Sequence, residues 1–207
     1  ILAWTTTPWT LPGNVALAVH KDIYYGLFET PGGSEILIIA NKQARTLGLS
    51  DPIKVVKGNK LAGLAYEPLF DIKALHNGNS HKIYEADFVT DMEGTGVVHT
   101  AVMYGEDDYN LGVQVGLPQH HTVTETGFFT KEVPGGLAGL PVKAKATDEK
   151  IFAYLGKNNS VLKTQAHSHE YPFCWRCSTP LLYYATDSWF VNMQKVKQAL
   201  IANNKKI

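Results

Sequence analysis

Three consecutive threonines stand near the start of the chain, in the stretch WTTTPWTLPGN at residues 4–14. Alternate side chains of an extended strand face opposite sides, so Thr5 and Thr7 are expected to share one face and Thr6 the other. Pro8 then ends regular strand pairing. Hydroxyls and free backbone N–H groups at a strand end can bind a ribose or a phosphate. The alternative is a plain edge strand, in which threonine is a favoured residue.

A histidine followed by two aspartates forms a second candidate site. His99 ends a predicted strand at a glycine-rich loop, and Asp107 and Asp108 follow eight and nine residues later. Loops at strand ends often hold functional residues, and a buried carboxylate there could bind a cationic amine. In the alternative reading, one aspartate caps the following helix and His99 is a hydrogen-bonded interior residue. The sequence contains no Ser-His-Asp spacing, nucleophile elbow or dinucleotide fingerprint.

The two cysteines, Cys174 and Cys177, form a C-x-x-C pair. Such a pair supplies two of the four ligands of a structural zinc site. His167 and His169 are close in sequence, but their spacing to the cysteines matches no standard zinc finger. A second cysteine pair outside this sequence is therefore the better expectation for the remaining ligands. Two ordinary buried thiols, or a zinc-ribbon interaction domain, are the alternatives.

Composition limits the class of protein. The 207 residues are 44% apolar and 18% charged, which suits one globular domain with at most a short appendage. Nineteen basic and nineteen acidic residues give zero net charge, so any contact with nucleic acid is expected to be small. Two cysteines fit a reducing compartment, the cytoplasm, and no apolar run approaches the roughly 20 residues of a membrane span. Both ends look cut, which indicates a fragment of a larger protein.

The first 130 residues are rich in predicted strands. Hydrophobic and β-branched patterns predict strands at 15–20, 23–29, 35–40, 81–89, 95–99, 120–127 and 141–146, and two more within 52–70. Helices are predicted at 41–48, 106–115, 147–159 and 191–202. Many short strands with few helices favour a mostly β, barrel-like fold of the α+β class. We expect this body to cover residues 1–165, and a junction with the cysteine pair, a strand and a helix to cover 166–207.

Four stretches in a fixed order resemble one known family. They are WTTTPWTLPGN, KGNKLAGLAYEPLF, GTGVVHTAVMYGEDDY and YPFCWRCSTPLLYYATDSWF. With them, essentially the whole chain resembles the inserted editing domain, connective polypeptide 1, of isoleucyl-tRNA synthetases. The valyl and leucyl relatives carry Arg-Pro after two threonines, whereas this chain has Thr7-Pro8-Trp9-Thr10. One departure is Val102, where the family pattern has a proline.

The resemblance implies the β-barrel editing fold and an aminoacyl-tRNA deacylase site. It implies that the threonines bind the terminal adenosine of the tRNA and place a water, that His99 limits the size of the amino-acid side chain, and that Asp108 pairs with the substrate ammonium group. The implied catalytic residues are Thr5, Thr6, Thr7, His99 and Asp108, and the implied substrate-binding residues are Trp9, Asn14 and Asp107.

The implied reaction is hydrolysis of the ester in Val-tRNA(Ile), with valyl-adenylate as an open second substrate. The parent enzyme would ligate isoleucine to tRNA(Ile) with ATP. One methylene is worth only about 1–3 kcal/mol to a binding pocket, an established value for these synthetases themselves, so a second, smaller pocket is needed.

The expected partners are the 3′ end of tRNA(Ile) and the rest of a monomeric parent synthetase, with no membrane. No cofactor is expected in the pocket, and zinc is expected only at Cys174 and Cys177 of a full-length enzyme. The alternatives are a non-catalytic module that binds the tRNA end or holds the parent together, and a valyl-type editor of Thr-tRNA(Val).

Overall fold

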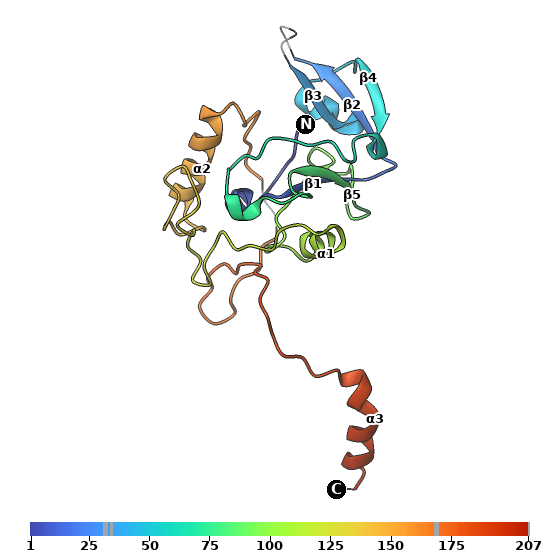
Figure 1. Cartoon of the computed structure of the whole chain (residues 1–207), viewed down its shortest axis with the longest axis vertical. Coiled ribbons are helices and arrows are strands. Elements are labelled where there is room, and N and C mark those ends of the chain that lie inside the picture. The colour runs from blue at the N-terminus through green and yellow to red at the C-terminus, as the bar shows by residue number, and fades with distance from the viewer. Residues whose placement is uncertain (31–32, 34, 168–169, 207) are drawn as a thin grey trace.

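The computed structural model describes residues 1–30, 33, 35–167 and 170–206, and Figure 1 shows the course of the chain. The strands are β1 (Ala16–Val19), β2 (Tyr24–Glu29), β3 (Ile36–Ala40), β4 (Lys54–Lys57), β5 (Lys82–Glu85) and β6 (Val97–Thr100). The α-helices are α1 (Glu106–Val115), α2 (Lys145–Lys157) and α3 (Met193–Asn204), and 3-10 helices occupy Pro8–Gly13, Asn41–Leu47, Gly58–Lys60 and Lys73–Leu75. The predicted α+β class is confirmed.

The strands form two three-stranded sheets. In the first sheet, of order β5-β1-β6, β1 is parallel to β5 and antiparallel to β6. All four residues of β1 are buried, as expected for a central strand that is covered on both faces. The second sheet has the order β3-β2-β4 and is antiparallel throughout. The register of the first sheet pairs Leu17 with His99, so the candidate histidine lies directly beside the central strand.

Short backbone contacts connect the two sheets. The N-terminal segment contacts both sheets, because the Leu2 N–H donates to the carbonyl of Ile38 in β3 (2.9 Å) and the Trp4 N–H to the carbonyl of Val97 in β6 (3.4 Å). Beyond β4, the Gly63 N–H donates to the carbonyl of Ile83 in β5 (2.8 Å). These links follow the order of a barrel wall. However, regular pairing among the described strands does not close, so the expected barrel is not seen. One reason is that turns interrupt the strands, as at Gly96, whose left-handed backbone (φ 69°) precedes β6.

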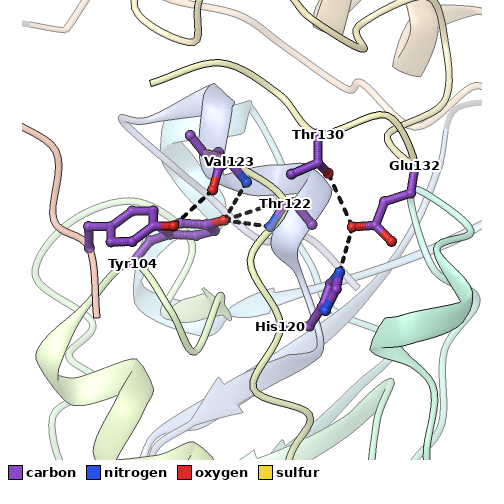
Figure 2. Close-up of polar contacts among 7 residues, drawn as sticks. Tyr104, His120, Thr122, Val123, Thr130 and Glu132 are labelled. Atoms are coloured by element: carbon purple, nitrogen blue, oxygen red, sulfur yellow. Dashed lines mark hydrogen bonds and ion pairs between the residues drawn. The ribbon is translucent and has the colours of Figure 1, made fainter. Parts of the chain in front are cut away.

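Three predicted strands are wrong: the second strand within 52–70, the strand at 120–127 and the strand at 141–146. Each of the three ranges contains only an isolated bridge, at Ala65, Val123 and Pro141 respectively. At 120–127 a side chain accepts hydrogen bonds from two of the backbone N–H groups that a strand ladder would use. The Tyr104 hydroxyl accepts from the N–H groups of Thr122 (2.7 Å) and of the next residue (2.8 Å), as Figure 2 shows. The sequence pattern was therefore incorrect about regular strand pairing in these ranges.

The helices agree more closely with the sequence. Helix α1 covers the predicted range 106–115, and its first turn contains three acidic residues, which the helix dipole favours. Gly116 ends α1 in the left-handed conformation that glycine adopts at low cost. Helix α3 contains no buried residue, and Figure 1 shows it away from the body, at the end of an extended segment.

The largest hydrophobic cluster lies under the Pro8–Gly13 turn and α2. Residues of the predicted junction take part in it, because Leu182 and Tyr184 pack against this cluster. The Ala185 N–H also donates to the carbonyl of Met103 (2.9 Å). The start of the junction is thus attached to the body, while the boundary near residue 165 stays a prediction. Across the described residues, no helix combines the length and the apolar character needed to cross a membrane.

Candidate functional site

A cavity of about 590 Å³ opens beside the N-terminal threonines. Four of the predicted site residues line it: Thr5, Thr6, Asn14 and His99. Leucine and valine side chains complete the wall, among them Leu11, Leu17, Leu155 and Val161. The cavity therefore has both hydroxyl and amide groups and an apolar surface, the combination that orients a small ligand in a pocket.

A chain of threonine hydroxyls fixes the first wall of the cavity. The Thr7 N–H donates to Thr5 Oγ1 (3.1 Å), and the two Oγ1 atoms lie 3.4 Å apart, so these side chains share a face as predicted. Thr10 Oγ1 donates to the Thr7 carbonyl (2.8 Å). Thr6 also lines the cavity, because the segment is irregular before the turn that begins at Pro8. Thr7 is bonded to this network but is not among the lining residues.

His99 lies beside Leu17 of β1 in the cavity wall and is only 9% exposed. Its Nε2 atom lies 3.0 Å from Thr10 Oγ1, while Nδ1 is enclosed and has no hydrogen-bond partner among the described residues. Burial lowers the pKa of His99 to about 4, so the ring is uncharged at neutral pH. Both nitrogens are thus withheld from the cavity. The geometry favours a neutral steric wall over a proton-transfer group.

Asn14 is held at the base of the cavity by two hydrogen bonds. Its Nδ2 donates to the Ala16 carbonyl (2.9 Å), and its Oδ1 accepts from the Tyr66 hydroxyl (2.6 Å). Burial raises the pKa of Tyr66 well above its ordinary value, which keeps the hydroxyl protonated as a donor. Tyr66 also lines the cavity but was missed from sequence. No local signal could have found it, because it lies far along the chain from Asn14.

Trp9 is placed behind the site and not in the cavity wall. Its side chain is 3% exposed and packs edge-on against Tyr104, with ring centroids 5.2 Å apart. The ammonium of Lys143 lies 4.9 Å from the Trp9 ring centroid and donates to the Tyr171 hydroxyl. Trp9 therefore anchors the Pro8–Gly13 turn in the core and supports the threonines indirectly.

The two aspartates occupy different environments in the first turn of α1. Asp107 is exposed, whereas Asp108 is largely enclosed and its Oδ1 accepts from the Ala101 N–H (2.8 Å). Neither aspartate is among the lining residues. The hydrogen bond ties Asp108 to the chain two residues beyond His99, at the end of β6. Burial raises the pKa of Asp108 to about 6, so the carboxylate is desolvated and gains from pairing with a cation.

Replacing Asp108 with asparagine is expected to stabilise the fold above pH 6. The folded-state pKa of about 6 exceeds the ordinary 3.8, so ionisation of Asp108 lowers the free energy of unfolding as pH rises through this window. Asparagine keeps an oxygen for the Ala101 N–H and does not ionise. The variant should be more stable by on the order of 2 kcal/mol at pH 8, and the gain should disappear at pH 4. Denaturant unfolding at both pH values measures this, and equal differences at both would contradict it.

The cysteine pair sits on a tight turn of the junction. The Ser178 N–H donates to the Cys174 carbonyl (2.8 Å), and Cys177 Sγ lies 3.0 Å from Thr179 Oγ1. Hydrogen bonding to Thr179 lowers the pKa of the exposed Cys177 thiol, which suits a metal ligand. Within the described ranges, no group of three or more His, Cys, Asp or Glu side chains could hold a metal ion. The thiols fit one half of a zinc site, and that assignment stays a prediction.

Of the two histidines considered as further zinc ligands, the structure describes only His167, which joins no metal-binding group with the cysteines. His169 lies outside the described residues. His167 lines the cavity and meets Trp4 edge-on, with ring centroids 5.0 Å apart. His167 is therefore a neighbour of the threonine segment, which its spacing to the cysteines did not reveal.

Comparison with known proteins gives the family. No family model matches the chain. Over its whole length the chain is 45% identical to the isoleucine–tRNA ligase of Clostridium acetobutylicum across 208 residues, which make up 20% of that protein. It is 44% identical to the isoleucine–tRNA ligase of Rickettsia akari across 213 residues, 19% of that protein. The chain thus spans about a fifth of the length of the curated relatives that it matches.

Two solved structures share the fold. GlLeuRS-CP1 superposes with a TM-score of 0.58 at 17% identity, covering 82% of this chain and 84% of that one. The editing domain of the P. knowlesi cytosolic leucyl-tRNA synthetase superposes with a TM-score of 0.53 at 12% identity, covering 89% and 83%. At such identities the likeness establishes the fold alone. Sequence and fold agree: the chain belongs to the isoleucyl-tRNA synthetase family, as a segment with the fold of the connective polypeptide 1 editing domain.

Proposed function

We propose that this chain is the proofreading unit of an isoleucyl-tRNA synthetase and that its cavity hydrolyses the ester of Val-tRNA(Ile). One observation carries the proposal: threonine hydroxyls, the Asn14 amide and an uncharged His99 face the same half-apolar cavity. Hydroxyl and amide groups suit the ribose and base of a terminal adenosine, and the apolar wall suits a branched aliphatic side chain.

The proposed chemistry is water positioning. An aminoacyl ester is already reactive, so an enzyme can hydrolyse it by holding a water near the carbonyl, without a covalent nucleophile. Thr5 and Thr6 are the hydroxyls in the cavity wall that can hold this water and the ribose. Thr7 keeps Thr5 in place through its backbone N–H.

The ammonium group of the substrate is assigned to Asp108, which is not among the residues that line the cavity but is held beside the end of β6. This carboxylate is fixed by the Ala101 N–H at the end of the strand that carries His99. Its raised pKa supports the assignment, because a desolvated carboxylate gains more from an ammonium partner than a solvated one does. His99, neutral and held by Thr10, would limit the side chain to the size of valine.

The remaining parts of the proposal concern the parent protein. Zero net charge suits a domain that receives only the single-stranded 3′ end of tRNA(Ile), while the rest of the synthetase holds the tRNA body and ligates isoleucine with ATP. We assign a monomeric parent and no cofactor in the cavity. Valyl-adenylate is a second substrate that the same cavity could accept.

Single-turnover hydrolysis by the full-length synthetase tests the proposal. Val-tRNA(Ile) should be deacylated about 100-fold faster than Ile-tRNA(Ile), since the substrates differ by one methylene that must clash with the wall. If neither ester is hydrolysed above the buffer rate, the chain is a non-catalytic module that binds the tRNA end. If Thr-tRNA(Val) is the preferred substrate, it is a valyl-type editor. Either result would overturn the proposal.

A further inference from the structure

Thr10 was absent from the residues that sequence assigned to the site, but its hydroxyl occupies a central place there. Thr10 Oγ1 lies 2.8 Å from the Thr7 carbonyl, 3.0 Å from His99 Nε2 and 3.4 Å from Thr7 Oγ1. A hydroxyl has one proton to donate and two lone pairs to accept with. The three contacts use this capacity in full.

The donors and acceptors around Thr10 determine which ring nitrogen of His99 carries the proton. The Thr7 carbonyl can only accept, so the single Thr10 proton goes to it at the shortest of the three distances. His99 Nε2 must then be the donor to Thr10 Oγ1. Because burial holds the pKa of His99 at about 4, the ring carries one proton, and that proton lies on Nε2.

The environment of the other nitrogen agrees with this assignment. His99 Nδ1 is enclosed and has no partner among the described residues. A buried N–H without an acceptor costs the desolvation of a donor. The tautomer with the proton on Nε2 avoids this cost, since Nδ1 then presents only a lone pair.

We infer that Thr10 is a positioning residue for substrate selection. It holds His99 as the Nε2-protonated tautomer and fixes the rotation of the ring, so that ring carbon forms the cavity wall beside the acyl side chain. The part of this inference that concerns selection rests on the proposed function. The tautomer assignment is independent of it, because it follows from the contacts of Thr10 alone.

The experiment compares Thr10→Val, which removes the hydroxyl at nearly constant volume, with Thr10→Ser, which keeps it. Long-range ¹H–¹⁵N spectra of the 207-residue chain report the tautomer, with the His99 signals assigned by their loss in His99→Gln. Wild type and Thr10→Ser should show a pyrrole-type Nε2 and a pyridine-type Nδ1. In Thr10→Val the His99 signals should shift toward the other tautomer or a mixture of both. Exposed Thr126→Val is the matched control and should leave the spectrum unchanged.

Selectivity is then measured in the full-length synthetase as the ratio of Val-tRNA(Ile) to Ile-tRNA(Ile) hydrolysis. Thr10→Val should lower this ratio by about tenfold, the order of one methylene contact, and Thr10→Ser should restore it. A wild-type His99 protonated on Nδ1, or a Thr10→Val variant that keeps both tautomer and ratio, would overturn the inference. If wild type hydrolyses neither ester, the proposed function fails, while the spectra still decide the tautomer.

Discussion

Hydrolysis of Val-tRNA(Ile) is expected to fall at least about 100-fold when Asp108 is replaced with alanine, because loss of the ammonium anchor lets the ester carbonyl drift from the positioned water. Single-turnover deacylation by the full-length variant measures this loss. Glu106→Ala is the matched control, since it removes the same charge from the same helical turn at an exposed position, and its rate should stay within about twofold of wild type. Undiminished hydrolysis by Asp108→Ala would refute the anchoring role.

A second variant separates the position of the Asp108 carboxylate from its charge. A Cβ atom at Gly105 would lie 2.1 Å from Asp108 Oδ2. Gly105 has an extended backbone that any residue can adopt, so Gly105→Ala acts by displacing the carboxylate. Gly105→Ala should lower the rate of Val-tRNA(Ile) hydrolysis, as Asp108→Ala does, although the charge of the carboxylate remains. Normal hydrolysis by Gly105→Ala would show that the carboxylate need not be held where the structure places it.

The features predicted best from sequence were those encoded locally. Helix α1 covers the predicted range because its acidic first turn and the terminal Gly116 are adjacent signals. The predicted proximity of Thr5 and Thr7 is confirmed by their hydrogen bonds, but the segment is not a strand, and the prediction that Thr6 faces away from Thr5 is wrong because both line the cavity. The prediction of a strand at 120–127 was wrong because the Tyr104 hydroxyl, from another segment, accepts hydrogen bonds from two of its backbone N–H groups.

The candidate site shows the same division between local and distant information. His99 and the threonines were found by residue type and by resemblance to the family. Tyr66 and the role of Thr10 depend on contacts between segments far apart in the sequence, which no local pattern encodes. Trp9 was a conspicuous part of the motif, yet it packs in the core. A motif therefore indicated the segment that forms the site without showing which of its side chains face the cavity.

Trimming His99 to alanine is expected to expose Ile-tRNA(Ile) to hydrolysis, raising its rate by about tenfold or more. The physical reason is steric. His99 is neutral, both of its nitrogens are withheld from the cavity, and the ring is fixed by Thr10, so its contribution to the site is the space that it occupies. Single-turnover assays of both esters with the full-length variant make the measurement.

The two substrates respond differently under this explanation. Val-tRNA(Ile) already fits, so its hydrolysis by His99→Ala should change by only a few-fold, whereas a proton-transfer role would reduce hydrolysis of both esters together. Thr10→Val should shift the ratio in the same direction as His99→Ala but by less, since it loosens the ring without removing it. If isoleucine stays protected in His99→Ala while valine is still hydrolysed, another part of the cavity wall sets the size limit. The tautomer held by Thr10 would then have no bearing on selection.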